Sequence, residues 1–413
     1  MHPNRLTGFL LLVPSSFSTR RIVAHLVLAL ATLLSLGAPS AAQLPVQLSE
    51  QATISLLTLA PGDEVHTIFG HGAIRVVDPV GGFDVSFNYG TFEFEDGFVA
   101  KFMYGELDYF LSVYPTQAAI DQAISKERSV VEQVFDLTAA ERQTVYAALC
   151  RNAQLENRTY RYDFLFDNCS TRIIDILRAA LGPRLAMPSG PFEARSFRTL
   201  LDEHIVSMPW MKFGFALLLG STVDREATFE ESWFLPRHLR VALEDASLNG
   251  KPFVSEERVL FDSGMSDMRA ASFDLPTAVC WALFVLAGLS VIRDTRGRLS
   301  RIIDGLLFGL VGAAGLFIAI MWGATLHHVT ASNWNVVWAL PTHLVVAVLL
   351  FRRNRPAWVR YYLGITAVLA FVVALGFGIP QTLSPAILPI GLLIALRAAV
   401  NARRWPEPTS PDR

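Results

Sequence analysis

A cysteine at the start of a predicted helix is the residue in this sequence best suited to nucleophilic chemistry. The segment Tyr160–Leu181 opens with aromatic and apolar residues, turns at Asp167 and Asn168, and continues with apolar residues at the spacing of an amphipathic helix. Cys169 therefore lies in the first turn of that helix, with Asp167 or Asn168 as the N-cap. There the unpaired backbone N–H groups and the positive end of the helix dipole favour a thiolate.

A cysteine nucleophile also needs a base that takes its proton. The domain between the predicted export signal and the long apolar runs of the C-terminal part contains four histidines: His66, His71, His204 and His238. His71 has a glycine on either side, so its small neighbours leave the imidazole approachable as the chain enters a strand. We predict that His71 is the base, with His66 as the reserve candidate.

Less specific interpretations of these residues stay open. Cys169 can be a packed thiol or half of a disulfide with Cys150. His71 can be a structural histidine at a strand end, with its ring nitrogens hydrogen-bonded. The third cysteine, Cys280, lies inside an apolar run. The sequence contains neither a C-x-x-C pair nor a zinc-ligand spacing. We therefore expect no structural metal and no cofactor.

The composition indicates a protein that is partly in a membrane. Hydrophobic residues make up 52% of the 413 residues and charged residues 17%, which is too apolar for an ordinary soluble enzyme. The formal net charge is −2, and the scattered basic residues do not form the footprint of a nucleic-acid-binding protein. We therefore expect a membrane as a partner and no nucleic acid.

The N-terminus has the pattern of an export signal. Two arginines precede an apolar run over residues 22–36, and small residues at Ser40 and Ala42 fit a cleavage site before Gln43. We predict a signal peptide over residues 1–42, with an uncleaved signal anchor as the alternative. In both cases the domain that follows lies outside the cytoplasm.

Residues 43–272 have the composition of a globular domain, without any run of about 18 apolar residues. We expect strands over residues 54–60, 73–77 and 83–89. A helix is expected over residues 138–152, with Thr138 as N-cap and Glu141 completing a capping box. Strands followed by this helix and by the Cys169 helix predict an α+β catalytic domain.

The C-terminal part contains five apolar runs, each close to the length that spans a membrane. They cover residues 276–292, 303–323, 334–351, 361–378 and 383–400. Eight arginines fill the first and third connections, whereas the second and fourth contain no Lys or Arg: Arg293, Arg296, Arg298, Arg301, Arg352, Arg353, Arg355 and Arg360. By the positive-inside rule we predict a five-helix membrane domain over residues 273–402, a periplasmic domain before it, and a cytoplasmic tail over residues 403–413.

Six ordered motifs run through both predicted domains. They are F-G-H-x-x-x-R at residues 69–75, F-N-Y-G-T-F at 87–92, E-N-R-x-Y-x-Y-D-F at 156–164, D-N-C-x-T-R at 167–172, T-x-x-H at 325–328 and N-W-N-x-x-W-x-x-P at 333–341. Together they resemble the bacterial Lnb-type lipoprotein N-acyltransferase family over nearly the whole mature chain. The order of His before Cys is also similar to the circularly permuted papain-like folds of the lecithin:retinol acyltransferase group, over the catalytic domain alone.

The resemblance implies a thiol-dependent acyltransferase of the bacterial inner membrane, a multi-pass protein with its catalytic domain in the periplasm. Cys169 matches the nucleophile and His71 the base. An acyl chain is expected to pass from a phospholipid donor, through a Cys169 thioester, to the N-terminal amine of a lipoprotein acceptor. The implied fold is a circularly permuted papain-like domain followed by a five-helix membrane bundle.

Three supporting residues have basic side chains and two interpretations each. Arg75 and Arg172 are suited to bind the donor phosphate through their guanidinium groups. Alternatively, they form structural ion pairs with nearby aspartates: Asp163, Asp167 or Asp175. His328, at the periplasmic end of the second apolar run, is a further supporting candidate, with packing at the membrane interface as the alternative.

The uncharged supporting residues lie next to the two main candidates. Asn88 or Tyr89 is expected to orient His71 or to donate to the oxyanion, with turn formation and packing as the alternative. Asn168 precedes the nucleophile, and the backbone N–H of Cys169 is the expected oxyanion donor.

Two other functions remain as alternatives. A papain-like peptidoglycan peptidase or amidase would use the same Cys/His pair, because a fold does not determine its substrate. A non-enzymatic envelope module would contain Cys169 as a disulfide-bonded or simply buried residue. Thiol reactivity distinguishes the module from both enzymes, and lipid products distinguish the acyltransferase from the peptidase.

Overall fold

The computed structural model describes residues 45–93, 97–189, 193–264, 272–293, 298–352 and 356–405. The predicted signal peptide and residues 406–413 of the predicted tail lie outside these ranges.

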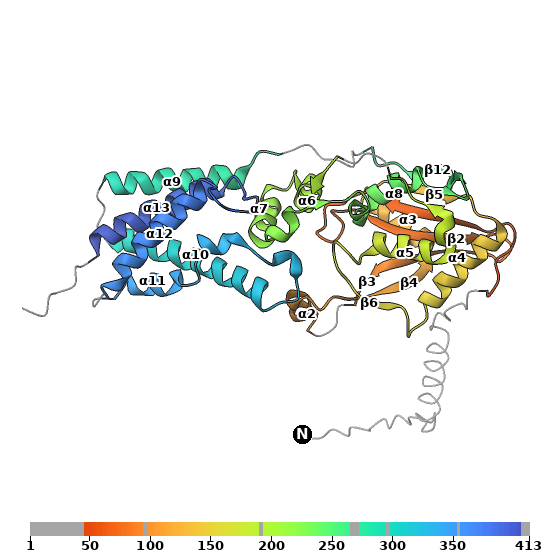
Figure 1. The fold of residues 1–413 in the computed structure, drawn as a ribbon, viewed down its shortest axis with the longest axis horizontal. Helices are drawn as coiled ribbons and strands as arrows, with labels where there is room; N and C mark the ends of the chain where they lie inside the picture. Colours follow the sequence, from red (N-terminus) through yellow and green to blue (C-terminus); the bar gives the residue numbers. More distant parts are fainter. Residues whose placement is uncertain are drawn as a thin grey trace, which may run out of the picture. The chain divides into compact units, whose positions relative to one another are not determined.

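A seven-stranded sheet forms the centre of the first domain (Figure 1), and each strand is antiparallel to its neighbours. The strand order is β12-β5-β1-β2-β3-β4-β6. The strands are β1 Thr53–Leu59, β2 His71–Asp78, β3 Phe83–Thr91, β4 Asp108–Pro115, β5 Val130–Phe135, β6 Thr159–Arg161 and β12 Val254–Phe261. The three strands predicted from the sequence are confirmed as β1, β2 and β3.

Two helices predicted from the sequence lie against this sheet. Helix α4 (Ala139–Asn152) begins after Thr138, and the predicted capping box with Glu141 is present. Helix α5 (Cys169–Leu181) packs on β2 and β3 through its buried apolar face: Ile173, Ile174, Leu177 and Leu181. Gly72 of β2 makes this close packing possible, since a Cβ there would lie 3.2 Å from Cδ1 of Ile173.

The remaining elements that precede the apolar C-terminal helices, here called the first part, are short, and η marks the 3-10 helices among them. The helices are α2 Phe98–Tyr104, α3 Thr116–Ser125, α6 Phe197–Ile205, α7 Pro209–Leu218, α8 Pro236–Glu244, η1 Gly182–Arg184, η2 Ser221–Asp224 and η3 Glu231–Phe234. The small sheets contain β7 Leu185–Ala186, β10 Ser247–Leu248 and β11 Lys251–Pro252 in one, and β8 Arg195–Ser196 and β9 Glu226–Ala227 in the other. This sheet-rich part followed by a helical part confirms the α+β class.

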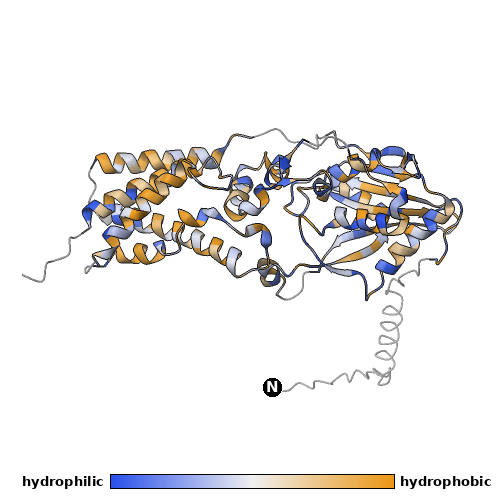
Figure 2. Ribbon diagram, viewed as in Figure 1, coloured by the Kyte–Doolittle hydropathy of each residue, from blue (hydrophilic) through white to orange (hydrophobic). Residues whose placement is uncertain are grey.

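The C-terminal part is helical and apolar (Figure 2). Its elements are α9 Leu275–Ile292, α10 Arg298–Gly323, η4 His328–Thr330, η5 Trp334–Val337, α11 His343–Leu349, α12 Trp358–Ala374 and α13 Ile387–Arg404. In the described part of the chain, two helices are long and apolar enough to cross a membrane, at Leu275–Ile292 and Leu299–Gly323. Helix α12 is apolar but shorter.

The third apolar run does not form one continuous helix. It is divided into η5 and α11, and Pro341 lies between them. Proline lacks a backbone N–H and disfavours helical geometry at the preceding residue, which explains the interruption. The irregular segment packs on α10 at Gly315, where a side chain would collide with the carbonyl oxygen of Ala339.

A buried ion pair joins three helices of the C-terminal part. The guanidinium of Arg397 (α13) donates to both carboxylate oxygens of Asp304 (α10), at 2.6 and 2.8 Å. It also donates to Ser290 Oγ of α9 at 2.9 Å and to Ser300 Oγ of α10 at 2.8 Å. Asn401 donates to Asp304 at 2.9 Å. Both buried charges therefore have partners, as an apolar environment requires.

Candidate active site

Cys169 is the first residue of α5, and it is 9% exposed. Asn168 is the N-cap: its Oδ1 accepts from the N–H groups of Ser170 at 2.8 Å and Thr171 at 3.2 Å. Its Nδ2 donates to the carbonyl of Phe234 at 2.9 Å, which ties the start of the helix to a distant segment. Asn168 therefore fixes the position of Cys169. The N–H of Cys169 itself is at a helix position where backbone donors have no partner within the helix.

His71 is the first residue of β2, and Asn88 of the neighbouring β3 holds its ring. The distance between His71 Nε2 and Asn88 Oδ1 is 2.6 Å. The same Oδ1 accepts the N–H of Gly90 at 2.9 Å, which supports its assignment as oxygen. Because an amide oxygen only accepts, Nε2 carries the proton and Nδ1 is the nitrogen left for the thiol. Gly90 makes room for the ring, since a Cβ there would lie 2.6 Å from His71 Cε1.

The side chains of Cys169 and His71 interact directly and shift each other's pKa. Burial raises the pKa of Cys169, but the charge and hydrogen bond of His71, with the backbone N–H of Gly72, bring it below the ordinary value. Burial lowers the pKa of His71, but the charge and hydrogen bond of Cys169, together with Asn88, raise it above the ordinary value. Both net shifts favour a thiolate and an imidazolium. The pair thus has the charge distribution of an activated nucleophile.

Two tyrosines near the thiolate were not among the residues selected from the sequence. Tyr109 and Tyr162 stack with ring centroids 4.3 Å apart. Burial, and then the charge of Cys169, raise the pKa of Tyr109 to about 12 and that of Tyr162 further. Both stay protonated at neutral pH. Tyr162 belongs to one of the motifs, which was a usable signal. Tyr109 carries no sequence signal, because the pairing of β4 with β6 places it there.

Tyr89 is buried in the sheet beside Asn88. Its carbonyl accepts from the hydroxyl of Tyr160, and the two rings lie 6.3 Å apart. Its own hydroxyl has no hydrogen-bond partner among the residues described. Of the two residues considered for orienting His71, Asn88 is therefore the one that makes the contact.

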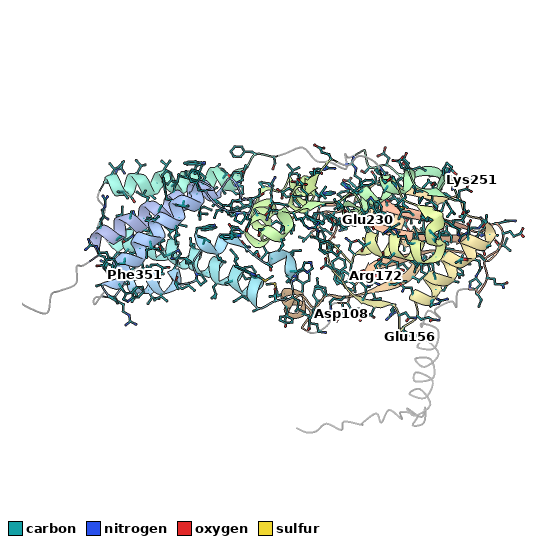
Figure 3. All side chains as sticks on the ribbon, viewed as in Figure 1. Asp108, Glu156, Arg172, Glu230, Lys251 and Phe351 are labelled. Carbon is teal, nitrogen blue, oxygen red and sulfur yellow. The ribbon has the colours of Figure 1, made fainter. Side chains whose placement is uncertain are left out.

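Both candidate phosphate-binding arginines are paired with carboxylates. Arg75 contacts Asp84 at 2.5 Å and Glu132 at 3.0 Å, because β3 and β5 flank the β1–β2 pair. These partners differ from the three aspartates considered from the sequence. Arg172, labelled in Figure 3, donates to Asp167, which was one of those three, with 2.5 Å between Nη2 and Oδ2.

His328, from the C-terminal part, contacts the turn that precedes Cys169. Its Nε2 lies 3.1 Å from Asp163 Oδ2, and its ring stacks on Phe166 at 5.7 Å. Asp163 Oδ1 in turn accepts the N–H groups of Leu165 and Phe166, both at 2.9 Å. His328 therefore supports the turn that precedes Cys169. His66, the reserve candidate for the base, is exposed and pairs with Glu64 at 3.3 Å.

All three cysteines are free thiols. Cys150 is half-buried in α4, and burial raises its pKa, whereas the pKa of Cys169 is lowered. Within the described ranges, no group of three or more His, Cys, Asp or Glu side chains could hold a metal ion. The site contains a Cys–His pair whose histidine is held by an asparagine.

Two family models match the chain. The Lnb N-terminal periplasmic domain matches residues 46–203, and the Lnb transmembrane domain matches residues 269–405. No curated protein matches, and no solved structure matches. The two matches confirm the resemblance that was inferred from the ordered motifs, in both parts of the chain.

Proposed function

Because the chain belongs to the Lnb family and has a periplasmic domain followed by a transmembrane domain, we propose that it is a thiol-dependent lipoprotein N-acyltransferase of the inner membrane. The observation that carries this proposal is the arrangement of Cys169, His71 and Asn88. The donor is a membrane phospholipid, and the acceptor is the α-amino group of the lipid-modified N-terminal cysteine of a lipoprotein.

In the first half-reaction, the Cys169 thiolate attacks the carbonyl carbon of a phospholipid ester. The oxyanion that forms is stabilised by the backbone N–H of Cys169 at the start of α5. As the intermediate collapses, the C–O bond breaks and the His71 imidazolium protonates the departing alkoxide. The products are a Cys169 thioester and a lysophospholipid.

In the second half-reaction, the acceptor amine attacks the thioester. Neutral His71, held by Asn88 through Nε2, takes the proton from the amine through Nδ1. The C–S bond breaks, and Cys169 leaves as a thiolate beside the newly formed imidazolium. Covalent storage of the acyl group lets the spent lysophospholipid leave before the second lipid arrives.

The proposed organisation of the chain follows the sequence prediction. A signal peptide over residues 1–42 precedes a circularly permuted papain-like domain over residues 43–272, five membrane-crossing segments over residues 273–402 and a cytoplasmic tail. The third segment crosses as a broken helix. A reporter fused near Arg298 is expected to be cytoplasmic, and a periplasmic reporter would contradict this topology.

The free thiols and the contact of His328 with the catalytic turn favour a lipid-using enzyme over the two alternatives. A peptidoglycan peptidase has no evident use for a contact between its site and a transmembrane domain. A non-enzymatic module predicts that Cys169 is no more reactive toward iodoacetamide than Cys150. The lowered pKa of Cys169 predicts the opposite.

The proposal is tested by separating the two half-reactions. Purified protein mixed with phospholipid alone is expected to accumulate an acyl adduct on Cys169, labile to hydroxylamine, and to release about one equivalent of lysophospholipid per site. A diacylated lipopeptide with a free α-amine discharges the adduct, and an N-blocked peptide does not. Cys169→Ala forms no adduct.

Three results would replace the proposal. Lysophospholipid that appears only with the acceptor, without any trapped adduct, would indicate direct transfer. Steady hydrolysis that ignores the acceptor would make the protein a phospholipase. Cleavage of peptidoglycan fragments without a lipid product would make it a peptidase.

A further inference from the structure

Two short apolar helices of the first part, α2 and α7, have no buried residues. Val99 of α2 is 72% exposed and Trp210 of α7 is 52% exposed, and Phe102 and Tyr104 are exposed as well. Contiguous exposed apolar side chains are uncommon on soluble surfaces and mark contact sites. The connection that follows α10, residues 326–332, shows what these helices contact, and we call it the α10 loop.

The α10 loop is hydrogen-bonded to the C-terminal end of α2. The N–H of Leu326 donates to the carbonyl of Tyr104 at 2.8 Å, and His327 Nε2 lies 2.9 Å from the carbonyl oxygen of Phe102. Gly105 ends the helix with a φ of 93°, and a Cβ there would lie 3.1 Å from Leu326 Cβ. The glycine therefore allows the loop to approach the helix closely.

The same loop is hydrogen-bonded to the chain just after α7. The N–H of Gly220 donates to the carbonyl of Val329 at 3.0 Å, and the N–H of Ser221 donates to that of Ser332 at 3.1 Å. A side chain at Gly220 would collide with the carbonyl oxygen of Ala331. A glycine at the end of α2 and another two residues after the end of α7 thus allow the α10 loop to approach closely.

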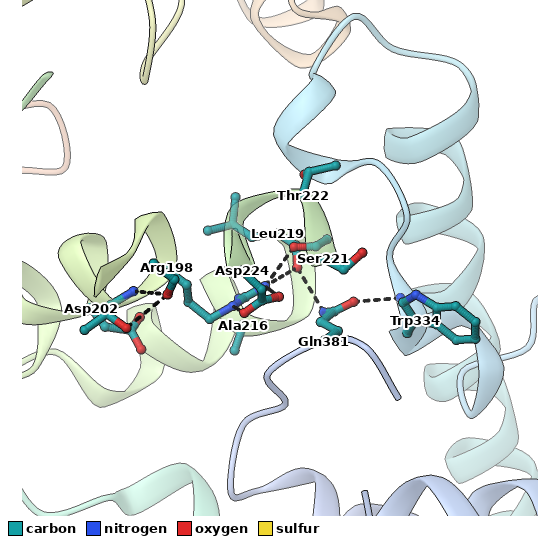
Figure 4. Close-up of polar contacts among 12 residues, drawn as sticks. Arg198, Asp202, Ala216, Leu219, Ser221, Thr222, Asp224, Trp334 and Gln381 are labelled. Carbon is teal, nitrogen blue, oxygen red and sulfur yellow. Dashed lines mark hydrogen bonds and ion pairs between the residues drawn. The ribbon is translucent and has the colours of Figure 1, made fainter. Parts of the chain in front are cut away.

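Three amide side chains of the C-terminal part cap α7. Asn333 and Asn335 donate to the carbonyls of residues 216–218, at 2.8 to 3.2 Å. Gln381 donates to the carbonyl of Leu219 at 3.0 Å and accepts the N–H of Trp334 at 2.7 Å (Figure 4). The last carbonyls of a helix have no partners within it, so these amides satisfy groups that would otherwise need water.

The α10 loop lies close to the membrane surface. Helix α10 contains a membrane-length apolar segment that ends at Gly323, and the loop begins three residues later. Elements that are hydrogen-bonded to this loop must lie at the same depth. Exposed apolar side chains at that depth face lipid rather than water.

Ring contacts connect both helices to the candidate site. Phe215 of α7 stacks on Phe69, which lies two residues before His71, with ring centroids 6.4 Å apart. Phe98 of α2 stacks on Phe92 at 5.4 Å. Phe92 contacts Tyr109, the tyrosine near the thiolate, at 5.0 Å.

We propose that α2 and α7 are interfacial helices, whose exposed apolar side chains enter the lipid on the periplasmic face of the membrane. Their partner is the phospholipid surface itself. Together they hold the Cys169–His71 site against the leaflet that contains the donor. The consequence for catalysis rests on the proposed function, whereas the membrane contact does not.

The contact is tested by photo-crosslinking of the full chain in phospholipid nanodiscs. Val99 and Trp210 are each replaced by p-benzoylphenylalanine, and Val80, which is 67% exposed in the β2–β3 turn, is the matched control. We expect the probes that replace Val99 and Trp210 to crosslink to phospholipid, and we expect no such crosslink from the probe that replaces Val80. The proposal would be overturned if the crosslinks led to a second copy of the protein or to a lipopeptide and none led to phospholipid. Equal labelling of lipid from all three positions would also overturn it.

A kinetic test uses the variant Val99→Ser/Trp210→Ser. Acyl-enzyme formation from bilayer phospholipid is expected to slow about tenfold, because apolar surface no longer enters the lipid. Acylation by a soluble short-chain ester is expected to stay unchanged, as is every rate of the Val80→Ser control. Equal losses with both substrates would assign the helices a structural role and overturn the proposal. If the unmodified protein reacts with neither substrate, the proposed function fails, and crosslinking still decides the membrane contact.

Discussion

Asn88 Oδ1 lies 2.6 Å from His71 Nε2, and this contact determines which imidazole nitrogen is available to Cys169. The proton of Nε2 is held by an acceptor that cannot donate, so Nδ1 serves the thiol. The same hydrogen bond contributes to the raised pKa of His71. One residue of β3 therefore orients the proposed base and, after the larger effect of Cys169, helps to raise its pKa.

Asn88→Ala is expected to shift the pH profile of acyl-enzyme formation. The thiolate–imidazolium pair exists above the lowered pKa of Cys169 and below the raised pKa of His71. Removing the Asn88 contact lowers the pKa of His71, so the alkaline limb moves to lower pH. The maximal rate falls about 10- to 100-fold, since a hydrogen bond to a charged group is worth ~1.5–3 kcal/mol.

The control is Asn157→Ala, which removes an exposed amide that donates to the carbonyl of Arg151. Its profile should match that of the unmodified protein. A slower Asn88→Ala enzyme whose alkaline limb does not move would indicate that Asn88 only packs against the ring.

Cys169→Ala and His71→Ala are each expected to abolish transfer, while the melting temperature stays within a few degrees of the unmodified value. The double variant should be no slower than either single variant, because a nucleophile and its base act as one unit. Cys150→Ala should keep its activity, since Cys150 is a free thiol of α4. A loss with Cys150→Ala as large as with Cys169→Ala would favour a shared structural role.

Arg75→Ala is expected to destabilise the domain rather than to weaken phospholipid binding. It leaves the Glu132 side chain, which is 4% exposed, without its closest cation. Removing one partner of a buried ion pair lowers the free energy of unfolding by about 3–5 kcal/mol, which denaturant unfolding measures. Arg75→Ala/Glu132→Gln should recover part of the loss. A raised KM for phospholipid with unchanged stability would instead support the phosphate-binding interpretation.

His328→Ala is expected to slow acyl-enzyme formation about three- to tenfold, because Asp163 loses the partner that supports the turn before Cys169. Asp163→Ala should be slower still, since it also removes the acceptor for two backbone N–H groups. His328→Gln keeps a donor and should recover most of the rate. No recovery with Gln would mean that ring stacking on Phe166, rather than the polar contact, supports the turn.

Local features of the site could be predicted from the sequence, because they depend on residues within one helical turn or one strand. Apolar spacing located α5 and placed Cys169 in its first turn, and the Thr138–Glu141 capping box marked the start of α4. Apolar runs located β1 and β2, alternation located β3, and turn residues marked the connections. These signals depend on contacts between residues that are close in sequence, so they can be recognised without the tertiary structure.

Contacts between distant segments were decided by the tertiary structure. Strand pairing selected Asn88 over Tyr89 as the partner of His71, and it gave Arg75 the partners Asp84 and Glu132. The contacts of the α10 loop with α2, α7 and the turn before Cys169 had no sequence signal beyond isolated motif residues. Such contacts depend on strand register and on the packing of whole elements, and a local pattern does not contain either.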